Sequence, residues 1–196
     1  KAQIADWIDR EGDVAGWVNI PSGTVAGTLK SPIVSAQVKA TELLAYDTLV
    51  PEANADLEYL GGVLSWQNGS ARLLEGEAQF DGRFVPRIRS GSTTFKLDGI
   101  NLESTPENLI PIDLVGKVSG QGRARVANGG LAGLTSTLQV QDLGVNDTLI
   151  GTGSVDAGFG STGWSANAEF GYADRFLVLE NARFDPKQQT VGGNLD

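Results

Sequence analysis

The chain has 196 residues, of which 24 are acidic and 15 are basic, and its formal net charge is −9. Contacts with phosphate need clustered lysine and arginine, and this acidic chain has no long basic run. We therefore do not expect nucleic acid as a partner. The chain contains no cysteine and no histidine, which excludes disulfides, thiolate metal sites and every catalytic pair of a nucleophile with histidine. We therefore expect no enzyme, no metal site and no cofactor.

The first predicted element is a short helix within residues 1–12. Ile4, Trp7 and Ile8 recur at helical spacing and would form one apolar side of such a helix. A frayed end of the chain accounts for the same residues almost as well.

From Asp13 onward, apolar residues recur at every second position, which is the period of a β-strand with one protected face. Val34, Ala36, Val38 and Ala40, for example, alternate with polar residues. Turn signals interrupt these runs roughly every ten to twelve residues, which is typical of an all-β meander. The signals include Pro21-Ser22-Gly23, Asn68-Gly69 and Asp81-Gly82.

One helix signal interrupts the β pattern. Thr105 offers a cap, Pro106 suits the first helical position, and Glu107 lies near the positive end of a helix. Pro111 then ends the element after about one turn, because proline removes an amide donor.

The most regular alternation spans residues 149–172, with a turn at residues 160–163. The pattern assigns Leu149, Gly151 and Gly153 to the protected face, and Ile150 and Thr152 to the opposite face. It predicts a long antiparallel hairpin. No composition shift divides the chain, so we expect a single unit over residues 1–196. Because it begins at Lys1 and stops within a strand-like pattern, we expect this unit to be one segment of a longer protein.

Only one face of the predicted sheet is apolar, and two architectures would protect such a face from water. Two sheets could enclose it as a closed core. A single sheet could instead curl and leave it as a groove, and small inward residues such as Gly153 and Ala166 would favour curvature and leave space inside. The pattern alone leaves both open.

Arg83, Arg87 and Arg89 form a local basic group. They would suit lipid phosphates at the rim of a groove, but a solvated strand edge accounts for them better. Closely spaced carboxylates such as Glu75 and Glu77 are likewise better explained as a solvated strand face than as a catalytic pair.

Two stretches resemble a known family. Residues 27–43 contain a Gly-x-Leu-x-x-Pro element at Gly27, Leu29 and Pro32, and residues 109–124 contain Gly-x-Val-Ser-Gly-x-Gly beginning at Gly116. Both resemble the strand-rich repeats of the TamB and AsmA-like family of envelope proteins, and the likeness extends over nearly the whole chain.

The resemblance implies a fold and a function. The fold would be all-β, a long and strongly curved antiparallel-rich sheet (a β-taco or repeating β-groove) with a hydrophobic interior and at most one or two short helices. The function would be carriage of phospholipid between the inner and outer membranes, which supports outer-membrane biogenesis and, through the translocation and assembly module, protein secretion. The protein would lie in the periplasm, be anchored in the inner membrane by a part outside these residues, and have a barrel of the outer-membrane assembly family as a further partner.

The family has no catalytic residues to transfer, so the resemblance implies only contacts with acyl chains. Strand parity assigns that lining role to Val14, Val18, Val25, Leu29, Val38, Leu138, Val155, Phe159, Trp164 and Phe170. Two alternatives remain open at this point: a structural or adhesive β-solenoid segment like those of autotransporters, and a periplasmic carrier with a closed β-barrel pocket.

Overall fold

In a computed structural model the chain forms one antiparallel sheet, and the structure describes residues 2–3, 14–45, 48–106, 112–185 and 190–195. Thirteen strands lie in sequence order, and the sheet is not closed, because the first and last strands do not pair. The strands are β1 (Ala2–Gln3), β2 (Val14–Thr28), β3 (Ser31–Ala45), β4 (Thr48–Leu60), β5 (Val63–Leu73), β6 (Gly76–Val85), β7 (Ser90–Asn101), β8 (Leu114–Ala127), β9 (Gly130–Val145), β10 (Thr148–Gly160), β11 (Gly163–Tyr172), β12 (Arg175–Asp185) and β13 (Thr190–Leu195).

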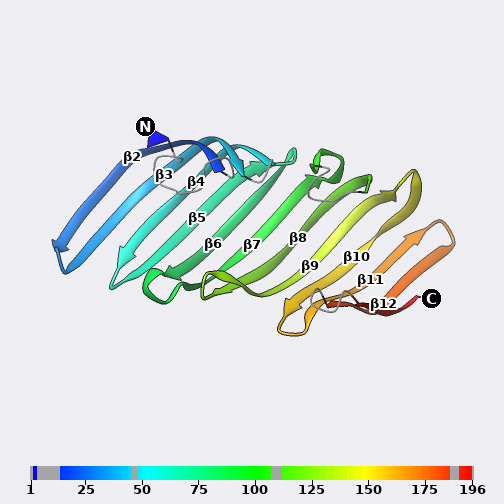
Figure 1. The fold of residues 1–196 in the computed structure, drawn as a ribbon. Coiled ribbons are helices and arrows are strands. Elements are labelled where there is room, and N and C mark those ends of the chain that lie inside the picture. Colours follow the sequence, from blue (N-terminus) through cyan, green and yellow to red (C-terminus); the bar gives the residue numbers. More distant parts are fainter. Residues whose placement is uncertain (1, 4–13, 46–47, 107–111, 186–189, 196) are drawn as a thin grey trace.

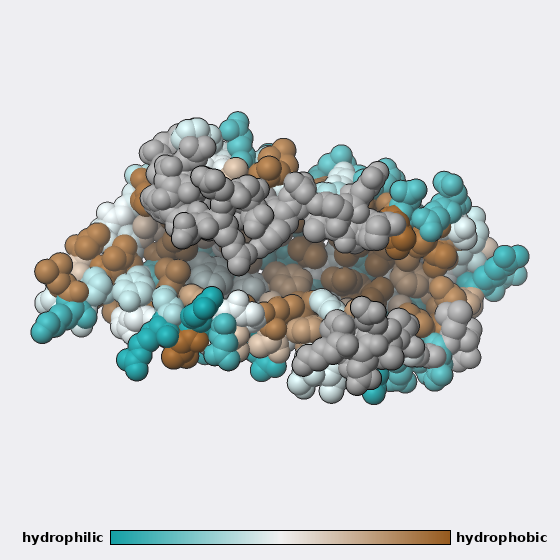
Figure 2. Space-filling view, viewed as in Figure 1, coloured by the Kyte–Doolittle hydropathy of each residue, from teal (hydrophilic) through white to brown (hydrophobic). Residues whose placement is uncertain are grey.

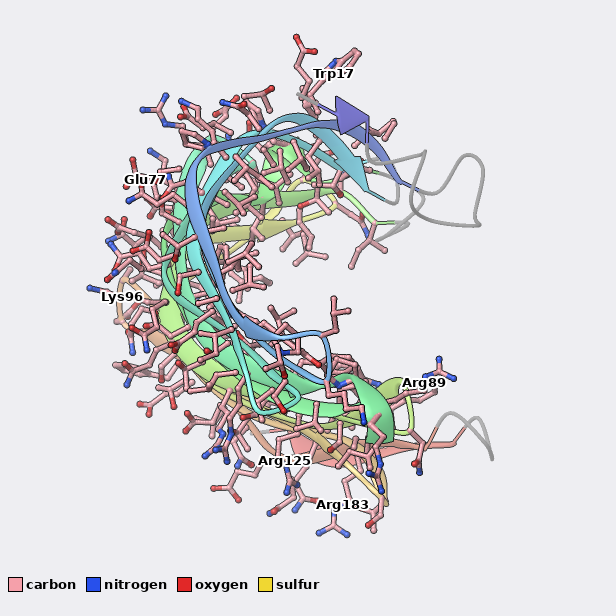
Figure 3. All side chains as sticks on the ribbon, turned by 90° about the vertical axis from the view of Figure 1, so that its left-hand side faces the viewer. Trp17, Glu77, Arg89, Lys96, Arg125 and Arg183 are labelled. Atoms are coloured by element: carbon pink, nitrogen blue, oxygen red, sulfur yellow. The ribbon has the colours of Figure 1, made fainter. Side chains whose placement is uncertain are left out.

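The sheet curls along its strands, each of which bends, so that the molecule seen along its length has the outline of a C (Figures 1 and 3). Long strands make this shape possible: β8 has 14 residues, which at about 3.3 Å per residue extends about 46 Å. One strand therefore reaches from one lip of the C to the other. The expected all-β, strongly curved antiparallel sheet is confirmed.

Three of the predicted turns are wrong, because they lie inside strands. Pro21-Ser22-Gly23 lies within β2, Asn68-Gly69 within β5 and Asp81-Gly82 within β6. The pairing register shifts between Asn19 and Ser22, and again between Trp66 and Gly69. At Pro21-Ser22-Gly23 and at Asn68-Gly69, residues with turn chemistry thus form β-bulges, which bend a strand and increase its twist.

A bulge also reverses the parity expected for the start of residues 149–172. The register of β10 against β9 shifts between Leu149 and Gly151 and between Gly151 and Gly153. Leu149 is consequently 47% exposed, whereas Ile150 packs against a buried cluster formed by Ile100, Val118, Val140 and Phe170. The predicted faces were therefore wrong at Leu149 and Ile150, whereas Gly151 is buried and Thr152 is exposed as predicted.

Helical structure is minor in the described part of the chain. It consists of two 3-10 turns, η2 (Pro86–Ile88) and η3 (Leu102–Ser104), and neither has the length and apolar character that crossing a bilayer requires. Of the helix expected within residues 1–12, only Ala2–Gln3 are described, as strand β1. Most of the helix expected after Thr105 likewise lies outside the described residues.

Candidate functional site

The concave face of the curled sheet is the candidate site, and we call it the trough. Figure 2 shows apolar side chains inside the hollow that runs along the molecule between its two rims. In the end-on view, the labelled charged residues Glu77, Lys96, Arg125 and Arg183 point away from the inside of the C (Figure 3).

One line of paired residues forms the floor of the trough, with one residue from each strand from β2 to β12. All of them are apolar or glycine, so this floor row is continuous across eleven strands. In order they are Val18, Ala40, Ala53, Ala71, Ala78, Leu97, Gly120, Leu138, Val155, Ala168 and Leu179.

The neighbouring line of paired residues is polar throughout and belongs to the convex face. Its members bond to one another: Asn54 Nδ2 donates to Ser70 Oγ at 2.9 Å, and Thr137 Oγ1 donates to Asp156 Oδ1 at 2.7 Å. This outer row comprises Asn19, Lys39, Asn54, Ser70, Gln79, Lys96, Gln121, Thr137, Asp156 and Asn167. A shift of one residue therefore separates this apolar row from this polar row.

No second layer of described residues covers the trough. Among the described residues no side chain is completely buried, and only Ala40, Ala78, Ile100, Val118, Val140 and Phe170 are buried hydrophobics. The accessible surface is 13163 Å², whereas a compact monomer of 20.6 kDa would expose about 8,900 Å². The excess is the signature of a single open sheet rather than of a two-layer core.

The two halves of the trough differ in side-chain size. From β3 to β6 the floor row consists of alanines, whereas from β7 to β12 it includes Leu97, Leu138 and Val155. These three side chains pack against the buried cluster of Ile100, Val118, Val140 and Phe170. The half nearer β12 therefore supplies most of the packing, while the half nearer β2 has the smaller floor side chains.

Glycines on the inward face accommodate aromatic rings of neighbouring strands. A Cβ atom on Gly82 would lie 2.5 Å from the indole of Trp66, and one on Gly153 would lie 2.7 Å from the ring of Phe170. The same cross-strand pairing joins Gly69 with Phe80, Gly91 with Phe84 and Gly122 with Phe95. The expectation that the inward glycines leave free space is wrong at these positions, because a ring fills each of them.

The residues predicted to line the groove fall into three groups. Phe170 is 6% exposed and belongs to the buried cluster, and Leu138 and Val155 pack against that cluster. Phe159 and Trp164 are cross-strand partners whose ring centroids lie 4.9 Å apart, and Trp164 keeps 39% of its surface exposed.

The remaining members lie toward β2. Val18 and Val38 are half-buried and pair with the inward alanines Ala40 and Ala55. Val25 is 79% exposed and Leu29 is fully exposed at the turn after β2. The backbone of Val14 pairs with Ala45, but its side chain lies outside the described set.

The prediction concentrated on the two ends of the chain and omitted the middle of the trough. Trp66, Phe80, Phe84 and Phe95 lie on the inward face, as their pairing with the inward glycines shows. Their alternation was visible in the sequence, but the bulges in β5 and β7 obscured which face it belonged to. Ile100 was missed altogether, because the register shift between Leu97 and Ile100 breaks the period of two just before it.

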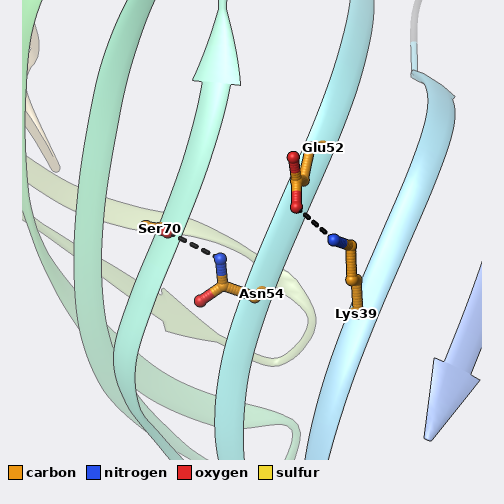
Figure 4. A network of polar contacts seen from close by, with 4 residues as sticks. All are labelled: Lys39, Glu52, Asn54 and Ser70. Atoms are coloured by element: carbon orange, nitrogen blue, oxygen red, sulfur yellow. Dashed lines mark hydrogen bonds and ion pairs between the residues drawn. The ribbon is translucent and has the colours of Figure 1, made fainter. Parts of the chain in front are cut away.

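Among the described residues, an ion pair joins Lys39 Nζ and Glu52 Oε1 on the convex face (Figure 4). The Lys39 ammonium hydrogen-bonds and attracts the Glu52 carboxylate, which lowers the pKa of that carboxyl, and Arg72 adds a smaller effect in the same direction. No group of acidic side chains within the described ranges has the arrangement of a metal site.

Comparisons of the chain with protein-family models, with curated proteins and with solved structures give no match. The resemblance to the TamB and AsmA-like family therefore stays a hypothesis. The trough itself is the firmest basis for a function.

Proposed function

We propose that this chain is a segment of a periplasm-spanning envelope protein of the TamB and AsmA-like kind. Its trough shelters the acyl chains of phospholipid and carries the lipid between the inner and outer membranes. The observation that supports this most directly is the floor row, which is apolar across eleven strands and which no second layer of described residues covers. Large exposed apolar surfaces mark ligand-binding grooves or contacts with proteins and membranes.

The energetics suit a conduit. Each methylene group removed from water is worth about 0.8 kcal/mol, so a trough that covers two acyl chains retains a lipid against water. Because the floor row repeats at every strand, the gain is similar at successive positions along the trough. A lipid can then move along it without leaving a single deep well.

The topology favours this proposal over its two alternatives. A closed-barrel carrier needs its first and last strands to pair, and these strands do not pair here. A β-solenoid stacks successive turns of chain, whereas every described pairing here joins consecutive antiparallel strands. Neither alternative accounts for an apolar face that no described residue covers as a second layer.

The first test is native mass spectrometry of the purified chain, followed by organic extraction of any bound lipid. We expect phospholipid adducts, and we expect an environment-sensitive apolar dye to bind and to be displaced by added phospholipid. Absence of adducts together with exclusion of the dye would reject the trough as a lipid site.

A second test uses the alternation of the two faces. A photo-crosslinking residue is placed at Leu57, which is inward and half-buried, or at Glu58, which is outward and exposed. With a radiolabelled phospholipid we expect crosslinks at position 57 and none at position 58. Equal labelling at both positions would indicate adsorption of lipid to the protein surface and would contradict the proposal.

A further inference from the structure

The turns that join the strands lie alternately on the two lips of the trough, and the two sets carry opposite charge. One set contains Lys30, Arg87 and Arg89 and, among the described residues, no acidic side chain. We call it the basic lip, and its described residues are 29–30, 61–62, 86–89, 128–129 and 161–162. The connections on the other lip contain Glu75, Glu103, Asp113, Asp147 and Asp174 and, within the described ranges, no basic side chain.

Arg87 and Arg89 form the centre of the basic lip. Both are exposed, and they flank Ile88, which is 58% exposed. Arg89 follows η2 with a left-handed backbone (φ 49°) and its N–H donates to Pro86 O at 3.1 Å. This conformation is uncommon for a long side chain, and it directs Arg89 outward at the mouth of the C (Figure 3).

The neighbouring turn on the same lip holds Arg89 in place. The backbone N–H of Gly129 donates to Arg89 O at 2.9 Å. A Cβ atom on Gly129 would lie 2.6 Å from Nη2 of Arg89, so the guanidinium lies directly over this glycine. Two turns that are distant in sequence thus cooperate to place one arginine.

No described carboxylate pairs with Arg87 or Arg89, since the ion pair of the described residues is the one between Lys39 and Glu52. Arg83 and Arg125 lie behind the basic lip on the convex face, and each is the cross-strand partner of Ser92. In a chain of net charge −9, Arg87 and Arg89 are thus two guanidinium groups at the rim of the apolar trough without a described acidic partner. Arginine bonds phosphate oxygens in a bidentate manner.

We infer that the basic lip binds the phosphate of a phospholipid whose acyl chains lie in the trough. This inference rests on the proposed function and adds an orientation to it. The headgroup lies at Arg87 and Arg89, and the acidic side chains of the other lip repel it from the opposite side. The trough therefore prefers a lipid with a net negative headgroup to a lipid of equal chain length without a phosphate.

The test compares three probes by native mass spectrometry of the whole chain: phosphatidylglycerol, diacylglycerol with the same acyl chains, and free glycerol phosphate. The variants are Arg87→Gln combined with Arg89→Gln, and Lys96→Gln as the control, because Lys96 lies on the convex face midway between the lips (Figure 3). We expect the wild-type chain to bind phosphatidylglycerol on the order of tenfold more tightly than diacylglycerol. The double variant should bind both lipids equally, and Lys96→Gln should behave as wild type.

Each contrary result has a distinct meaning. If the wild-type chain binds both lipids equally, the basic lip does not bind the phosphate, and the proposal that the trough binds lipid is unaffected. If it binds neither lipid, both the phosphate site and the lipid-binding trough are contradicted. Tight binding of glycerol phosphate alone, lost in the double variant, would show a site for free anions instead. An equal loss of preference in Lys96→Gln would show long-range attraction by overall charge rather than a role for the lip.

Discussion

The backbone N–H of Asn68 donates a hydrogen bond of 2.8 Å to Oδ1 of Asp81 on the neighbouring strand. Asn68 lies in the β5 bulge with φ 52°, where its N–H has no place in the regular ladder. The same arrangement recurs at three further bulges, where a backbone N–H donates to a side-chain oxygen across the strand: Gly99 to Ser119, Asp142 to Thr152 and Asn181 to Asn167. The curvature of the sheet is therefore supported by a repeated polar contact.

Replacing Asp81 should test this contact. Asp81→Ala leaves the Asn68 N–H without its acceptor, and we expect a loss of about 1 kcal/mol in the free energy of unfolding, measured by urea denaturation. Asp81→Asn keeps a side-chain oxygen at the same place and should lose less than half of that. Equal losses in the two variants would mean that the carboxylate charge, and not the hydrogen bond, stabilises the bulge.

A second prediction concerns the glycines under the aromatic rings. In Gly153→Ala the new methyl group would meet the Phe170 ring and the Glu169 carbonyl, and we expect destabilisation of about 1–3 kcal/mol. Gly160→Ala is the matched control on the same strand, because nothing lies within 4 Å of its Cβ position. Similar unfolding midpoints for the two variants would contradict the proposed packing.

The sequence predicted the fold class because alternation is local. Val34, Ala36, Val38 and Ala40 lie on one face as the period of two requires, and their partners on the next strand follow the same rule. The bulges could not be predicted in this way. Asn68-Gly69 has the same left-handed preference in a tight turn and in a bulge, and only the pairing of β5 with β6 decides between them.

The site was predictable as a face but not as a set of contacts. The pairing of Gly153 with Phe170 and of Gly82 with Trp66 depends on the register between strands, which one sequence does not reveal. The opposite charges of the two lips depend in turn on which loops are true turns. Once Asn68-Gly69 and Asp81-Gly82 are assigned to strand interiors, Arg87 and Arg89 fall on the same lip as Lys30.

The aromatic residues at the end of the trough should separate packing from binding. Phe170 is buried and Trp164 is 39% exposed, so we expect Phe170→Ala to lower the free energy of unfolding by about 3–5 kcal/mol. Trp164→Arg should keep the fold, as judged by circular dichroism and the unfolding midpoint, and should lose bound lipid. If Trp164→Arg unfolds the chain, its ring belongs to a closed core and the trough is not open there.

The ion pair on the convex face makes a prediction about pH. The folded-state pKa of Glu52 lies below its usual value of 4.5 because of Lys39. The pair therefore contributes stability that is fully present above pH 4.5 and disappears as the pH falls through the lowered pKa. Glu52→Gln should be less stable than wild type at pH 7 and equal to it in strong acid.

Two comparisons control this pH experiment. Glu58→Gln changes an exposed carboxyl on the same strand and face and should leave stability at pH 7 nearly unchanged. Addition of 1 M salt should reduce the difference between wild type and Glu52→Gln, because exposed charges are screened. A difference that persists unchanged in strong acid would mean that Glu52 acts through packing and not through its charge.

The last prediction concerns the turn that positions Arg89. Gly129 and Gly61 both lie in turns of the basic lip with positive φ, 80° and 60°, so alanine at either position should cost about 1 kcal/mol of backbone strain. The surroundings differ: the guanidinium of Arg89 lies over Gly129, whereas nothing lies within 4 Å of the Cβ position of Gly61. Gly129→Ala must therefore displace Arg89, and Gly61→Ala leaves it in place. We expect the two variants to unfold at similar urea concentrations, but only Gly129→Ala should lose the preference for phosphatidylglycerol over diacylglycerol. Loss of that preference in both variants would assign it to the general integrity of the lip and would leave no positioning role for Gly129.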